Sequence, residues 1–121
     1  MSKRNVVHIE IPATNTQSAA KFYEAVFGWK MEHNTEFDYT MWSDGANTGG
    51  GFIHPEDENA DGKILIYIDS DNIDADLKQV TALGGTVLKS KTEIPGTGWY
   101  AVFKDPTGNR LALYTSMNPQ Q

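Results

Sequence analysis

The feature that most constrains this chain is an internal repeat. Residues 7–29 show the pattern of a strand, a turn, a helix and a glycine stop, and the pattern returns 57 residues later in residues 64–86. After each copy, residues 39–44 align with residues 100–105, at an offset of 61. A chain of 121 residues that repeats one pattern is predicted to hold two copies of one supersecondary unit. Six of the 23 aligned positions are identical, namely Ile9/Ile66, Ile11/Ile68, Asn15/Asn72, Lys21/Lys78, Ala25/Ala82 and Gly28/Gly85.

The first copy is predicted to fold as β-α-β-β-β. Apolar and polar residues alternate over residues 6–11, which predicts a strand with His8 and Glu10 on one face. Asn15 can cap the next helix and Gly28 can end it. Strands are predicted over 29–32 and 39–43, followed by a glycine-rich segment, 49–53. The helix is expected to pack on the sheet through a stripe at helical spacing, made of Ala19, Phe22, Tyr23 and Val26.

The second copy repeats this order after an acidic segment, residues 54–63, which we interpret as a linker. Its first strand carries Leu65 and Tyr67 on the face that corresponds to His8 and Glu10. Asn72 caps the second helix, and strands follow over 86–89, 99–104 and 110–115. The second buried stripe is predicted to be Ile73, Leu77, Val80 and Leu83.

The fold class that follows is α+β, with two βαβββ modules in tandem. The modules are predicted over residues 5–53 and 64–116 of a single domain. A helix on one face of each mixed, curved sheet leaves the other face open, and two such sheets can enclose a ligand cleft. By alternation, the cleft face of the first strands carries His8, Glu10, Leu65 and Tyr67.

Composition excludes several classes of function. The net charge of −6 and the absence of an Arg/Lys cluster argue against a nucleic-acid partner. No apolar run reaches the roughly 18 residues of a membrane span, and the N-terminus does not have the pattern of a signal peptide. The chain has no cysteine, which excludes disulfides and thiolate metal sites and fits a reducing cytoplasm.

Two motifs extend these inferences. The segments FYEAVFGW, residues 22–29, and IPGTGWYAVFKDPTGN, residues 94–109, resemble the vicinal oxygen chelate superfamily. This superfamily includes the glyoxalases, the bleomycin resistance proteins and the extradiol dioxygenases. The resemblance covers residues 5–116 and is strongest to the glyoxalase-like branch. It implies the glyoxalase/bleomycin resistance/dihydroxybiphenyl dioxygenase fold and a homodimer, but no particular reaction, because this fold supports many.

The resemblance also implies four positions for ligands of a divalent metal. In this chain they fall on His8, Gly51, Leu65 and Ala112, of which only His8 can coordinate. Catalytic sites generally use about three protein ligands, so we expect neither a catalytic metal nor another cofactor. His8 and Glu10 remain candidates for a general base and the group that orients it, although His8 can equally be a hydrogen-bonded wall residue. The predicted cleft residues are His8, Glu10, Gly51, Leu65, Tyr67, Ala112, Trp42, Trp99, Phe103 and Tyr114.

Three functions remain open at this point. The first is a protein of sequestering or resistance type, which binds a small organic molecule without a metal. The second is an enzyme of the fold, a lyase, isomerase or dioxygenase, with a divergent metal site. The third is a dimeric interaction or regulatory module whose cleft serves only for pairing.

Overall fold

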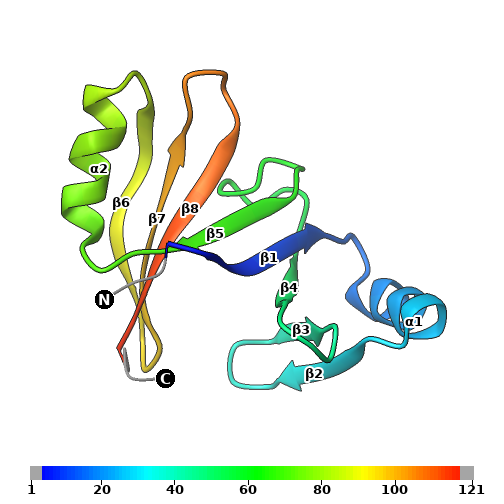
Figure 1. The fold of residues 1–121 in the computed structure, drawn as a ribbon. Coiled ribbons are helices and arrows are strands. Elements are labelled where there is room, and N and C mark those ends of the chain that lie inside the picture. Colours follow the sequence, from blue (N-terminus) through cyan, green and yellow to red (C-terminus); the bar gives the residue numbers. More distant parts are fainter. Residues whose placement is uncertain (1–3, 118–121) are drawn as a thin grey trace. The chain divides into compact units, whose positions relative to one another are not determined.

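The computed structural model describes residues 4–117, which divide into two compact units: residues 7–65, and residues 4–6 with 66–117. Each unit holds one helix and a mixed four-stranded sheet (Figure 1). The architecture is therefore α+β, and it follows the predicted order β-α-β-β-β twice. In the described part of the chain, neither helix has the length and apolar character needed to cross a membrane.

The first module contains five regular elements. They are β1 (Val6–Pro12), α1 (Thr16–Phe27), β2 (Lys30–Asn34), β3 (Tyr39–Ser43) and β4 (Gly49–Ile53). Its strands lie in the order β2-β3-β4-β1, with β1 parallel to β4 and the other neighbours antiparallel. The glycine-rich strand β4 therefore lies between β1 and β3.

The second module repeats this arrangement. Its elements are β5 (Leu65–Asp69), α2 (Ile73–Ala82), β6 (Thr86–Ile94), β7 (Gly98–Lys104) and β8 (Arg110–Ser116). Here the order is β5-β8-β7-β6, with β5 parallel to β8. Equivalent residues occupy equivalent register positions, since Glu10 pairs with Gly51 and Tyr67 pairs with Ala112.

Both helices begin as the sequence predicts. The side-chain oxygen of Asn15 accepts a hydrogen bond from the backbone N–H of Ser18, and Asn72 accepts one from Ala75. These bonds satisfy amide groups that have no partner within the first turn. Gly28 ends α1 with a φ of 72°, a left-handed conformation that glycine adopts without strain.

The predicted helix stripes need correction. Ile73 and Leu77 of α2 are buried, and they pack with Ala101 and Leu113 of the sheet. Leu83 is 75% exposed, because the helix already ends at Ala82.

The error is larger in α1, which buries none of its residues. Phe22 and Val26 were predicted to face the sheet but are 57% and 55% exposed. Tyr23 contacts Phe52 of the sheet, and both Tyr23 and Phe27 contact Trp29, which lies between α1 and β2.

Candidate functional site

Strand β1 presents His8 and Glu10 on the face of its sheet that points away from α1. Ile9 and Ile11 alternate with them and pair with Gly50 and Phe52, and Phe52 contacts the helix. Successive side chains of a strand point to opposite faces, so His8 and Glu10 lie on the other side. Glu10 is only 8% exposed, and a buried carboxylate requires polar partners.

Tyr39, at the start of β3, supplies the partner that joins these two side chains. Its hydroxyl oxygen lies 2.7 Å from Oε2 of Glu10 and 2.7 Å from Nε2 of His8. Nε2 of His8 and Oε2 of Glu10 are themselves 3.9 Å apart. The three residues form one hydrogen-bonded chain, which we call the polar triad.

The triad exists because position 51 is glycine. A Cβ on Gly51 would lie 1.9 Å from the hydroxyl oxygen of Tyr39 and 2.2 Å from its Cζ. No real side chain tolerates such contacts, so any other residue would force the ring away. The glycine at one implied metal-ligand position thus leaves the space that a tyrosine fills.

The triad also determines which nitrogen of His8 carries a proton. Tyr39 has one phenolic proton, which it donates to the carboxylate of Glu10. The bond between Tyr39 and His8 therefore needs a proton on Nε2 of the imidazole. Burial lowers the pKa of His8 below its usual 6.5, which favours the neutral ring with the lone pair on Nδ1.

The side chains at the implied metal positions do not fit a divalent ion. Gly51, Leu65 and Ala112 offer no donor atom, and the phenol of Tyr39 lies between the two groups that could coordinate. Within residues 4–117, no three His, Cys, Asp or Glu side chains gather as a ligand set. Catalytic metal sites generally have about three protein ligands.

The second module carries apolar residues where the first carries the triad. Leu65 and Ala112 are fully buried, and Tyr67 is 8% exposed. Tyr114 donates a hydrogen bond to the carbonyl oxygen of Thr97. Their participation in a ligand cleft stays a prediction.

Three aromatic residues that were predicted to line the cleft pack on the helix side of their own sheets. Trp42 is buried and stacks on Trp29 at 4.2 Å, and Trp29 stacks on Tyr23 of α1. Trp99 and Phe103 pack against the core that α2 covers. Trp42 also forms part of the wall of the hollow described next, and the participation of Trp99 and Phe103 in a ligand cleft stays a prediction.

A hollow of about 440 Å³ opens beside the triad, entirely within the first module. Gly49 and Gly50 of β4 contribute backbone without side chains to its wall. His8 of the triad forms part of the wall, and Met31 and Met41 supply apolar surface. We call it the glycine hollow; its lining residues are Val7, His8, Lys30, Met31, Glu32, Met41, Trp42, Ser43, Gly49 and Gly50.

Tyr39 and the two methionines were missing from the predicted site. Strand alternation could have found Met41, because it shares a face with Gly51 and Glu10. The contacts of Tyr39 depend on how its ring crosses β4, which local periodicity does not describe.

Comparison with known proteins agrees with this architecture. The model of the Glyoxalase/Bleomycin resistance protein/Dioxygenase superfamily matches residues 5–113. The chain belongs to this superfamily. A glyoxylase-like domain-containing protein from Didymella fabae is 33% identical over 116 residues, which cover 88% of this chain and 90% of that protein. An uncharacterized protein from Mycolicibacterium smegmatis is 28% identical and covers 97% of this chain and 98% of its own length.

Solved structures of the superfamily share the fold. A methylmalonyl-CoA epimerase from Streptomyces coelicolor, in complex with 2-nitronate-propionyl-CoA, aligns with a TM-score of 0.67 and 21% identity over 97% of this chain and 99% of the epimerase. A superfamily member from Vibrio splendidus aligns with a TM-score of 0.64 and 14% identity over 93% of this chain and 98% of its own. At these identities the likeness concerns the fold alone.

Proposed function

We propose that this superfamily member binds a small, planar organic molecule in the glycine hollow and needs no metal to do so. The observation that carries the proposal is the position of the Tyr39 hydroxyl, 2.7 Å from both His8 and Glu10. The hydroxyl of Tyr39 forms hydrogen bonds with the imidazole of His8 and the carboxylate of Glu10, so these two groups have a partner without a metal ion.

The dimensions and chemistry of the hollow support this function. A volume of about 440 Å³ lies in the range of sites for small molecules, which run from roughly 300 to 1,000 Å³. Gly49 and Gly50 present backbone in place of side chains to the hollow. Met31 and Met41 add polarizable, adaptable surface, and His8 offers one oriented polar contact.

The polar triad gives the binding site its rigidity. Tyr39 holds the imidazole of His8 through Nε2, and Glu10 holds Tyr39. A preoriented polar group loses little conformational freedom when a ligand binds, which favours affinity. Glu10 is buried and acts through Tyr39, so it is a positioning residue.

The proposal can be tested with a panel of planar aromatic acids, phenols and heterocycles. Trp42 lines the hollow, so we expect a saturable change in tryptophan emission with micromolar dissociation constants for some members of the panel. Isothermal titration with Zn²⁺ and Ni²⁺ is expected to show no stoichiometric binding. One tightly bound metal per chain would refute the metal-free part of the proposal.

The internal repeat suggests the decisive variant. His8→Leu introduces the residue that the second module has at the equivalent position, Leu65. We expect it to weaken ligand binding at least tenfold, the effect of losing about 1.4 kcal/mol. His33→Leu is the matched control, because His33 contacts Thr40 and Asp38 and does not line the hollow. Equal binding by His8→Leu and the parent would place the ligand elsewhere.

We keep one second candidate, an enzyme of this fold that moves a proton. The observation favouring it is the same hydrogen-bonded chain, in which a neutral His8 can accept a proton while Tyr39 and Glu10 orient it. NMR of a bound compound in D₂O separates the two candidates. Exchange of a carbon-bound proton that His8→Leu abolishes would favour the enzyme, and binding without exchange would favour the sequestering function.

A further inference from the structure

A second hollow lies in the second module, on the side of the sheet that α2 covers. It has a volume of about 450 Å³ and is bounded by α2 and by residues of β5, β7 and β8. Val80 of the helix, with Phe103 and Leu113 of the sheet, supplies much of its apolar wall. We call it the α2 hollow. All of its lining residues belong to the unit of residues 4–6 and 66–117, and none of them lines the glycine hollow.

The internal repeat shows what the first module has at the equivalent place. Each of these three wall residues corresponds to a larger aromatic residue, namely Tyr23 for Val80, Trp42 for Phe103 and Phe52 for Leu113. In the first module these rings pack between helix and sheet, since Tyr23 contacts Phe52 with ring centroids 6.0 Å apart and Trp42 is buried. Protein interiors are closely packed, so smaller side chains on the same scaffold leave a space that a ring can enter.

Asp76 supplies a hydrogen-bond acceptor to the wall of the α2 hollow. Its Oδ2 accepts bonds from Nη1 of Arg4 at 2.8 Å and from the hydroxyl of Ser70 at 2.6 Å. In the part of the chain that the structure describes, its Oδ1 makes no hydrogen bond. Partial burial raises the pKa of Asp76, but the bonds from Arg4 and Ser70 lower it by more, so the carboxylate is ionised at neutral pH. Oδ1 can therefore accept a hydrogen bond from a ligand.

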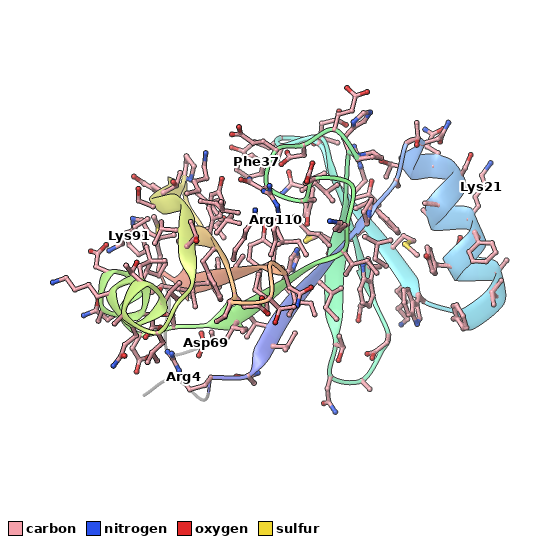
Figure 2. All side chains as sticks on the ribbon, turned by 90° about the horizontal axis from the view of Figure 1, so that it is seen from above. Arg4, Lys21, Phe37, Asp69, Lys91 and Arg110 are labelled. Carbon is pink, nitrogen blue, oxygen red and sulfur yellow. The ribbon has the colours of Figure 1, made fainter. Side chains whose placement is uncertain are left out.

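Arg4 fixes this carboxylate and balances its charge. Its guanidinium donates to Asp76 and lies 3.5 Å from the carbonyl oxygen of Asp69, beside which Figure 2 shows it. The wall of the hollow contains two cationic residues, Arg4 and Lys104, and two carboxylates, Asp76 and Asp105. A wall without net charge favours an uncharged ligand, and the free acceptor of Asp76 favours one that donates a hydrogen bond.

We propose that the α2 hollow is a second ligand site, which binds an uncharged monocyclic phenol. The ring packs against Val80, Phe103 and Leu113, and the hydroxyl donates a hydrogen bond to Oδ1 of Asp76. The first module supports this choice, because the side chain of Tyr23 is itself a phenol held between the same helix and sheet. The volume of about 450 Å³ lies in the range of small-molecule sites and admits a substituted ring.

The first experiment titrates ¹⁵N-labelled protein with p-cresol and follows the backbone amide signals by NMR. We expect saturable shifts at Gly85 and Leu113, with a dissociation constant below about 1 mM. Toluene lacks the donor, and benzoate carries a charge that Asp76 repels, so each should bind at least about tenfold more weakly. Gly49 and Gly50 report on the glycine hollow in the same spectra. Shifts confined to these two glycines, or no saturable shift, would overturn the proposal.

The second experiment fills the α2 hollow. Val80→Tyr introduces the residue of the first module and should weaken p-cresol binding, measured at Gly85, at least about tenfold. Thr81→Tyr is the matched control, because Thr81 is the next residue of α2, is exposed and does not line the hollow. His8→Leu should leave the shifts at Gly85 unchanged, so failure at the glycine hollow and failure here are distinguishable. Equal binding by Val80→Tyr and Thr81→Tyr contradicts the assignment.

The third experiment removes the acceptor and also decides the matter if Val80→Tyr does not fold, which circular dichroism checks. Asp76→Ala should abolish the preference for p-cresol over toluene. Asp74→Ala, on the same helix but exposed and outside the hollow, should keep that preference. A preference that survives Asp76→Ala would show that the hydroxyl has another partner, and the proposed site would then be wrong.

Discussion

Replacing Gly51 with alanine places a methyl group where the hydroxyl of Tyr39 lies. The new Cβ would be 1.9 Å from that oxygen and 2.2 Å from Cζ, so the whole ring must move. Strand β4 itself is compatible with a Cβ, since the equivalent residue of the second module is Ala112. The cost of Gly51→Ala therefore arises from Tyr39.

The magnitude follows from the contacts that the moving ring breaks. Tyr39 loses its hydrogen bond to the carboxylate of Glu10 and its bond to His8, both 2.7 Å long. A hydrogen bond to a charged group contributes about 1.5–3 kcal/mol, and a neutral one about 1 kcal/mol. Glu10 stays buried after the loss, so we expect Gly51→Ala to lower the free energy of unfolding by about 2–4 kcal/mol.

Urea unfolding of a double-mutant cycle isolates this effect. In a Tyr39→Ala background the clash is gone, and Gly51→Ala should be neutral or stabilising, because glycine inside a strand costs roughly 0.5–1 kcal/mol relative to alanine. The interaction term between the two positions should reach about 2–3 kcal/mol. If Gly51→Ala is harmless in the parent, or equally harmful in both backgrounds, the polar triad does not depend on the glycine and the reasoning fails.

Three further predictions test other parts of the structure. Because burial lowers the pKa of His8 below 6.5, the unfolded chain takes up this proton at a higher pH than the folded chain does. The contribution of neutral His8 to the free energy of unfolding is therefore complete above about pH 6.5, and it is lost as the pH falls toward the pKa of His8 in the folded chain. Urea unfolding at several pH values should show that the free energy of unfolding depends less on pH in His8→Leu than in the parent. Leu77→Ala removes a buried residue of the α2 core and should cost about 2–4 kcal/mol in the same assay. Asn15→Ala and Asn72→Ala each remove a helix cap worth about 1 kcal/mol, and hydrogen exchange should show wider fraying in α1, which buries no residue.

Local patterns in the sequence predicted the elements of the fold well. The two Asn caps, the Gly28 stop and the strand Tyr39–Ser43 depend on side-chain and backbone preferences within a few residues, and the structure confirms them. The observed strands differ from the predicted ones mainly in length, since β6 extends to Ile94 and β1 includes Pro12. The repeat itself predicted the βαβββ order, because homologous segments fold alike.

The sequence alone also determined which implied metal positions lack donor atoms. Gly51, Leu65 and Ala112 cannot coordinate an ion in any conformation, so this conclusion needed only residue identity. Likewise, alternation along β1 placed His8 and Glu10 on one face, because the side-chain period of a strand does not depend on its neighbours.

Tertiary structure decided everything that depends on how non-adjacent elements meet. Tyr39 joins His8 and Glu10, from which it is 31 and 29 residues distant in the chain, because Gly51 of β4 leaves room for the tyrosine ring between β1 and β3. An apolar stripe predicts that one face of a helix is buried, but it does not identify the element that packs on this face. Sequence pattern thus marked Phe22 and Val26 as buried, whereas the structure leaves both exposed, since burial is set by the packing partner and not by the periodicity of the helix.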